Sequence, residues 1–218
     1  MDFNFALVVN SFPLLLEGAL VTIKITALSV GFGLLIGLVA SIARMSKLWL
    51  VKMLASLYVD FIRGTPLLVQ IFIIYFALPM ITGVRVDPLV AAITACSINS
   101  GAYVAEIFRA GIESIDKGQM EAALSVGMSF RQAMVRIIGP QATKICIPPL
   151  VNQFIMTLKN SSIASLVTIT ELFRTGEQII YTTFRSFEVY MAVAVLYLMM
   201  NSVFMVIADR LERKMARQ

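Results

Sequence analysis

Several acidic and amide side chains lie inside long apolar stretches of this 218-residue sequence. Asp60 lies in one such stretch, and Asn99 and Glu106 lie in the next. Polar groups within apolar spans are costly to desolvate, so they mark places where a polar ligand can bind. Two carboxylates would favour a ligand that carries positive charge. We therefore expect Asp60, Asn99 and Glu106 to contribute to a substrate site.

The spacing around Asn99 supports a cavity. Asn99, Ala102, Tyr103 and Glu106 follow an i, i+3, i+4, i+7 pattern, which places them on one face of a helix. Ala102 leaves room beside the two polar groups. Tyr103 could offer its ring to a cation, although an aromatic residue in such a stretch is more often a packing residue.

A third polar group follows Lys159, where we expect the chain to unwind at the end of an apolar stretch. Its serine hydroxyls, or free backbone N–H groups, could bind a substrate carboxylate. The predicted substrate-binding residues are therefore Asp60, Asn99, Glu106, Asn160, Ser161 and Ser162.

Local pairing is the structural alternative for the charged members of this set. Asp60 with Arg63, and Glu106 with Arg109, are i,i+3 pairs that could neutralise each other. Asn99 could instead bond a neighbouring helix. The sequence leaves both interpretations open.

The elements that carry these residues are predicted to be membrane-spanning helices. The chain is 59% hydrophobic, and a stretch of about 20 apolar residues is enough to cross a bilayer. The sequence predicts a single all-α transmembrane domain over residues 1–218, with about five spans. They are expected at residues 20–43, 54–79, 88–108, 138–167 and 189–208.

Lysine and arginine residues gather in segments on one side of these spans, and the positive-inside rule places that side in the cytoplasm. We therefore expect a multi-pass protein of a bacterial cytoplasmic (inner) membrane, with its N-terminus outside and its C-terminus inside. This distribution also explains the net charge of +5 without nucleic-acid binding. The cations of the cytoplasmic side are Arg44, Lys47, Lys52, Arg109, Lys117, Arg131, Arg136, Arg210, Arg213, Lys214 and Arg217.

The cytoplasmic segment at residues 116–136 is predicted to form two short helices. Asp116 can cap the first helix, with Gln119 at the capping-box position, and Gly127 suits a left-handed terminator. Ser129 and Gln132 form a second capping box. The alternative is an amphipathic connector that lies on the membrane surface.

This segment resembles the EAA loop of binding-protein-dependent ABC importer permeases. The family pattern is Glu-Ala-Ala, three residues, Gly, nine residues and Ile-x-Leu-Pro. The positions that match are Glu121, Ala122, Ala123, Gly127, Ile137 and Pro140, while Gly139 stands where the family usually has Leu. The resemblance implies that Glu121, Ala122, Ala123, Gly127 and Pro140 couple the chain to an ATPase.

Further phrases resemble the polar amino acid branch of these permeases. They are FIRGTPLL at residues 61–68, AYVAEIFRAGI at 102–112, IPP at 147–149 and LKNSS at 158–162. Many relatives have Asp-Thr where this chain has Asn160 and Ser161, so the substrate preference of the branch does not carry over at Asn160.

The resemblance implies a type I importer permease that moves polar, in particular basic, amino acids. It implies an ATPase partner in two copies, which binds ATP and Mg. It further implies an extracytoplasmic amino-acid-binding protein facing residues 168–188. About five helices are few to enclose a pathway, so a second permease subunit, identical or a close paralogue, is also expected.

The chain itself is not expected to be an enzyme or to hold a cofactor. It contains no G-x-x-x-x-G-K-[ST] motif for ATP and no histidine. Cys96 and Cys146 lie in apolar stretches and are expected to pack, not to bind metal.

The alternatives to an importer permease are a secondary transporter or channel, in which Asp60 and Glu106 bind protons or ions, and a membrane-embedded enzyme or assembly subunit.

Overall fold

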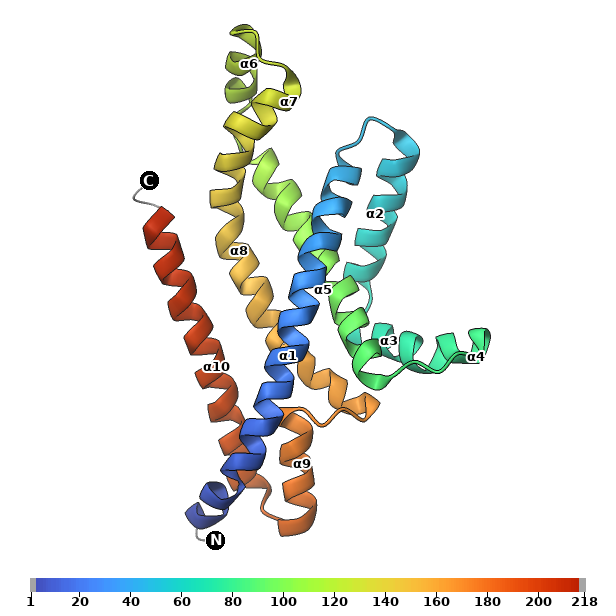
Figure 1. The fold of residues 1–218 in the computed structure, drawn as a ribbon, viewed down its shortest axis with the longest axis vertical. Helices are drawn as coiled ribbons and strands as arrows, with labels where there is room; N and C mark the ends of the chain where they lie inside the picture. The colour runs from blue at the N-terminus through green and yellow to red at the C-terminus, as the bar shows by residue number, and fades with distance from the viewer. Residues whose placement is uncertain (1–2, 216–218) are drawn as a thin grey trace.

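The structure is a computed structural model that describes the backbone of residues 3–215 and the side chains of residues 3–210. Within these residues the chain forms helices and no strand (Figure 1). The predicted all-α fold is therefore confirmed. Three of the cations used to predict orientation, Arg213, Lys214 and Arg217, lie outside the described side chains.

The longest helix is α1, which covers Phe5–Arg44 and is capped by the side chain of Asn4. It begins well before Leu20, the expected start of the first span. At about 1.5 Å per residue its 40 residues extend for about 60 Å, twice the thickness of a hydrocarbon core. Helix α1 is therefore longer than a perpendicular span of the hydrocarbon core requires.

Helix α5, at Pro88–Glu113, lies at the centre of the fold and packs closely along α1 (Figure 1). Small residues allow this approach. A Cβ atom added to Gly37 of α1 would lie 2.4 Å from the Val104 side chain, and one added to Gly33 would lie 2.9 Å from Ser100. Close packing of small residues is a common way for helices to associate in membranes, where lipid supplies no hydrophobic driving force.

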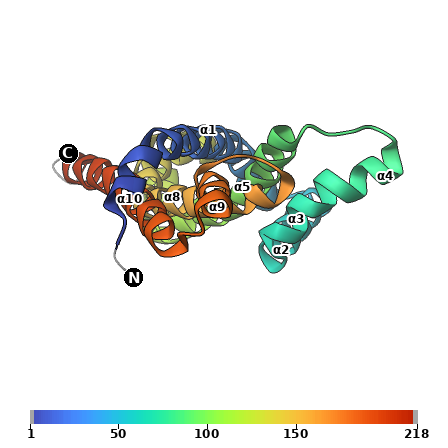
Figure 2. The same cartoon turned by 90° about the horizontal axis from the view of Figure 1, so that it is seen from below.

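The expected second span is broken. Helix α2, at Trp49–Gly64, is followed by α3 at Leu67–Phe72, a π-helical turn at Ile73–Ala77 and α4 at Leu78–Thr82. Thr65 is extended, Pro66 has no N–H to donate, and the two halves meet at a bend of 108°. The arm from α3 to α4 consequently projects sideways from the other helices (Figures 1 and 2).

The chain next forms the short helices α6, at Lys117–Ser125, and α7, at Phe130–Ala133, at one end of the molecule (Figure 1). A π-helical turn at Met134–Ile138 leads into α8 at Gly139–Asn160, which continues as a 3-10 helix at Ser161–Val167. Helix α9, at Leu172–Thr183, lies at the opposite end, and α10, at Ser186–Met215, runs back from it.

Length and composition allow three helices of the described part to cross a membrane: α1, α5 and residues 186–210 of α10. The bent pair of α2 with α3–α4 brings the number to four. Helix α8 is not among them, and it contains Pro148, Pro149, Lys144 and Lys159. The predicted number of spans and the side of the membrane on which each end lies stay predictions.

The α1–α5 contact gives a test of packing. Gly37→Leu is expected to destabilise the protein by about 1–3 kcal/mol, because the new side chain must displace Val104 and the backbone of Gly101. Thermal melting in detergent would show a lower midpoint. Gly31→Leu is the matched control, since nothing lies within 4 Å of a Cβ at that exposed position of α1. Equal midpoints for the two variants would contradict the assignment of this contact.

Candidate functional site

Glu106 is held by three arginines from three helices. Its carboxylate lies 2.6 Å from Arg44 Nη1 on α1 and 3.5 Å from Arg63 Nη1 on α2, and it also bonds Arg109 one turn along α5. The side chain of Glu106 is 22% exposed. Arg44 and Arg109 donate charge-assisted hydrogen bonds to this carboxylate, which are stronger than neutral ones, whereas Arg63 contributes an ion pair. They tie α1, α2 and α5 together.

The predicted pairing of Glu106 with Arg109 is confirmed, whereas the pairing of Asp60 with Arg63 is not found among the described residues. Arg63 points instead to Glu106, and its guanidinium lies 5.5 Å from the ring centre of Tyr103. A ligand ammonium that approached Glu106 would therefore compete with three guanidinium groups. Asp60 is exposed on α2 and makes no ion pair within the described part of the chain.

Asn99 takes part in a buried amide pair. Its Nδ2 donates to Gln70 Oε1 on α3 at 3.0 Å, and both side chains are buried. The Nε2 of Gln70 donates to the carbonyl oxygens of Ile62 at 2.8 Å and Thr65 at 3.1 Å. Gln70 thus satisfies carbonyl groups that the break between α2 and α3 leaves free. Sequence reasoning missed Gln70, although an amide in the apolar stretch directly after Gly-Thr-Pro was a visible signal.

The third predicted group lies where α8 tightens into the 3-10 helix. Asn160 is half-buried, Ser161 is fully buried and donates to the Leu158 carbonyl at 2.8 Å, and Ser162 is half-exposed and donates to the Lys159 carbonyl at 2.8 Å. The helix geometry does change at this point, as the sequence suggested. Both hydroxyl protons are used locally, so neither serine has a free O–H for a substrate carboxylate in this structure, contrary to the expectation from sequence. The serine oxygens keep lone pairs that could accept from an ammonium.

The structure places the predicted substrate residues of the 3-10 helix apart from Glu106. The 3-10 helix packs on α3 and on the half of α5 that precedes Asn99, through a core that includes Leu67, Ala95 and Ala164. Glu106 lies two turns further along α5, beside a pocket of about 410 Å³. That pocket is lined by Arg63, Tyr103, Glu106, Ile107, Ala110, Gly111, Ser114, Ile145 and Pro149.

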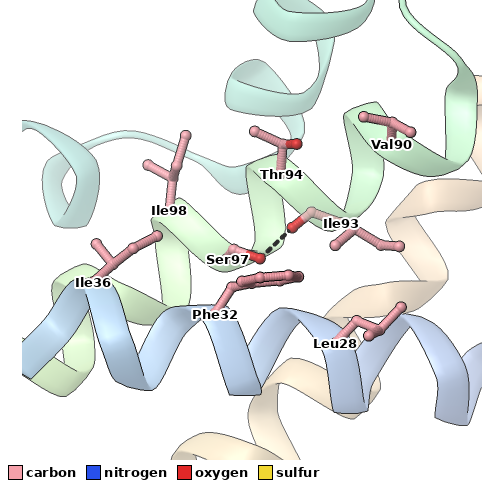
Figure 3. A pocket seen from close by; sticks show the side chains of 8 residues that line it. All are labelled: Leu28, Phe32, Ile36, Val90, Ile93, Thr94, Ser97 and Ile98. Carbon is pink, nitrogen blue, oxygen red and sulfur yellow. Dashed lines mark hydrogen bonds between the residues drawn. The ribbon is translucent and has the colours of Figure 1, made fainter.

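A second pocket, of about 430 Å³, lies between α1 and α5 (Figure 3). Phe32 and Ile36 of α1 face Ile93 and Ile98 of α5 across it, and no charged residue lines it. The hydroxyl of Ser97 is committed to the Ile93 carbonyl at 2.6 Å. Thr94 is its other hydroxyl-bearing residue, so the lining of this pocket is apolar except for these two hydroxyls.

The segment at residues 116–136 has the predicted local structure. Asp116 accepts from the Gly118 N–H, Gly127 adopts a φ of 85°, and Ser129 and Gln132 form a complete capping box. Gln119 does not join the first cap, since its Oε1 lies 3.4 Å from Gln141 Nε2 on α8. The caps fix α6 as a separate short helix that projects from the end of the molecule (Figure 1).

Residues of that segment differ in their accessibility. Ala123 is buried against the chain, while Glu121, Ala122, Gly127 and Pro140 are exposed. Leu124 and Val126 are also exposed, Val126 to 78%. The outer face of α6 therefore presents one carboxylate beside small and apolar side chains.

Glu171 is a buried carboxylate with a structural role that sequence reasoning did not single out. It is fully buried, and its carboxylate accepts the N–H groups of Phe173 at 3.0 Å and Arg174 at 2.9 Å at the start of α9. It also accepts the Tyr197 hydroxyl of α10 at 3.0 Å and lies 3.3 Å from the Thr22 hydroxyl of α1. Burial raises the pKa of this carboxyl, and the hydrogen bonds oppose that shift. Glu171 joins three helices at the end opposite α6.

No group of three or more histidine, cysteine, aspartate or glutamate residues that could hold a metal ion occurs within the described residues. Cys96 and Cys146 are both free and buried.

Comparison with known proteins gives a consistent picture. The model of the family described as "Binding-protein-dependent transport system inner membrane component" matches residues 29–217. The chain is 43% identical to the glutamine transport system permease protein GlnP of Escherichia coli (strain K12), over 99% of both chains. It is 35% identical to the arginine transport system permease protein ArtQ of Bacillus subtilis (strain 168), over 99% of this chain and 98% of that one.

A solved structure is similar over the whole fold. A crystal structure of an amino acid ABC transporter with histidines superposes with a TM-score of 0.93 and 42% sequence identity. The match covers 98% of this chain and 100% of the other.

The contacts of Glu171 predict a stability effect. Glu171→Ala is expected to cost about 1–3 kcal/mol, because the N–H groups of α9 and the Tyr197 hydroxyl lose a buried acceptor. Glu177→Ala removes only the partly exposed pair with Arg174 and should cost about 0–1 kcal/mol. Thermal melting in detergent would separate them, and a smaller loss for Glu171→Ala than for Glu177→Ala would contradict this role.

Proposed function

We propose that this chain, which belongs to the family of binding-protein-dependent transport system inner membrane components, imports polar amino acids with energy from a separate ATPase. It is an amino-acid ABC transporter permease subunit. The observation that carries the proposal is helix α6, which is capped as a separate element and projects from one end of the molecule (Figure 1).

The exposed face of α6 supports docking of the ATPase. A short helix that leaves Leu124 and Val126 uncovered needs a partner surface to bury them. Ala122 permits a close approach, and Glu121 adds a single charge that can fix orientation. Gly127 ends the helix, and Pro140 stands near the start of α8, so we propose that movement of α6 reaches α8 through α7 and the π-helical turn between them.

ATP and Mg are proposed to bind the ATPase, in two copies, and not this chain, whose sequence has no phosphate-binding loop. The arm from α3 to α4 supports a second permease subunit. Its π-helical turn and α4 contain no buried residue, and Met80 is 87% exposed. We propose that this arm packs against that subunit, whether a second copy or a paralogue.

The outer end of the chain is proposed to face an extracytoplasmic amino-acid-binding protein. Helix α9 carries the partly exposed pair of Arg174 and Glu177, and such a mixed-charge surface suits a transient contact.

Two classes of polar amino-acid substrate, basic and uncharged, are each supported by different residues. A basic side chain is favoured by Asp60, whose carboxylate is exposed and makes no ion pair among the described residues. An uncharged polar side chain is favoured by the amide pair of Asn99 and Gln70 and by Asn160, because Glu106 is already neutralised by arginines. Asn160, Ser161 and Ser162 are proposed to bind the substrate in either case.

The preference can be tested by uptake into proteoliposomes that contain the assembled complex. Asp60→Asn is expected to lower arginine uptake by up to about fivefold, because an exposed charge interaction contributes about 0–1 kcal/mol, and to leave glutamine uptake unchanged. Glu17→Gln, at an exposed carboxylate of α1, is the matched control. Unchanged arginine uptake by Asp60→Asn would remove Asp60 from the site and leave the uncharged preference.

The coupling proposal is tested by affinity purification of the tagged chain in mild detergent. The unmodified chain should retain the ATPase, and Glu121→Arg should retain at least tenfold less because the charge on the exposed face of α6 is reversed. Glu17→Arg makes the same change on α1, away from α6, and should retain the ATPase fully.

The opposite result would be equally informative. Failure of the folded, unmodified chain to retain any ATPase would contradict the proposal and favour a transporter driven by an ion gradient. Equal retention by Glu121→Arg and the unmodified chain would remove Glu121 from the docking surface.

A further inference from the structure

A pocket of about 500 Å³ lies between the end of α8 and helices α9 and α10, apart from Asn99 and Glu106. These three helices adjoin at the end of the molecule opposite α6 (Figure 1). Most of its wall is apolar and comes from α10, including Val193 and Leu198. Phe173 of α9 and Tyr190 of α10 stack with their ring centres 6.0 Å apart and add a flat aromatic surface.

Two polar groups in this pocket have no partner among the described residues. The ammonium of Lys159 makes no ion pair or hydrogen bond there, and the buried Oδ1 of Asn201 accepts none. The other hydroxyls are committed: Ser162 donates to the Lys159 carbonyl, and Tyr197 donates to Glu171. The pocket therefore contains one free cation and one free acceptor.

The buried Oδ1 of Asn201 is unfavourable without a donor, while Lys159 is exposed and its ammonium is accessible. A ligand that contacts both groups would be held by both. An ammonium needs an anionic oxygen, and a carbonyl oxygen needs an N–H donor. A molecule that contacts both groups must carry both functions, with an apolar or flat portion to lie along α10.

We propose that this pocket binds a zwitterion, with its anionic oxygen on Lys159 and its ammonium on Asn201 Oδ1. Two sources supply this chemistry: a free amino acid and the phosphoethanolamine headgroup of a membrane lipid. The amino-acid source rests on the proposed transport function, whereas the lipid source does not. The pocket lies apart from the amide pair of Asn99 and Gln70, and it shares Ser162 with the residues proposed to bind the transported substrate.

The test uses the complex of this chain with its ATPase in lipid nanodiscs, in two arms. The first arm measures equilibrium binding of labelled glutamine in discs that lack ethanolamine lipids. The second counts, by native mass spectrometry, the phosphatidylethanolamine molecules that stay bound when that lipid is present. Lys159→Met and Asn201→Leu remove the two proposed contacts, while Lys159→Arg and Asn201→Asp preserve a cation and an acceptor.

Matched controls are Lys144→Met on α8 and Asn10→Leu on α1, both exposed and outside the pocket. The removing variants should lose one bound zwitterion per chain, or weaken it at least tenfold, while the preserving variants and controls keep it. Co-purification of the ATPase verifies that each variant is folded, and it reports on the proposed function independently of this pocket.

Each outcome decides the proposal. Loss in the glutamine arm assigns the pocket to the amino acid, loss in the lipid arm assigns it to the headgroup, and loss in both shows that either source is accepted. Unchanged binding by the folded removing variants in both arms would overturn it. If neither removing variant folds, Lys159→Arg and Asn201→Asp decide: binding equal to that of the unmodified chain supports the site, and loss overturns it.

Discussion

The ion cluster around Glu106 is the interaction on which the arrangement of the helices depends most. One carboxylate meets Arg44 from α1, Arg63 from α2 and Arg109 from its own helix. A charge within an apolar span is unfavourable alone, so Glu106 is stabilised by these arginines, of which Arg109 also pairs with Glu113. The cluster fixes α1 and α2 against α5, and the glycines of α1 complete the contact by letting the two long helices approach closely.

Polar residues within the helices therefore serve two purposes. Glu106, Gln70 and Glu171 satisfy groups that helix breaks and neighbouring helices expose, and they keep the fold together. Asp60, Lys159 and Asn201 are not used in this way among the described residues, which leaves them free for ligands. In the proposed function, the first group of residues holds the helices together and the second group is available to bind ligands.

Much of the fold could be predicted because local signals were strong. The caps at Asp116 and Ser129 and the left-handed Gly127 follow from residue type and spacing, and the structure has all three. The 108° bend after Gly64 could not be measured from sequence, because Gly and Pro indicate a break and not its angle. The partner of Arg63 could not be predicted either, because spacing suggested Asp60, whereas tertiary packing brings Glu106 from another helix. Glu171 was missed since its partners are distant in sequence.

The most direct test of the role of Glu106 is thermal melting of the complex carrying Glu106→Gln, with and without added arginine or glutamine. Loss of the carboxylate leaves Arg44, Arg63 and Arg109 facing one another, so we predict a lower midpoint without ligand. The increase in midpoint that each amino acid produces should be unchanged. An unaltered midpoint without ligand, combined with loss of the increase caused by arginine, would contradict this account and show that Glu106 binds the substrate.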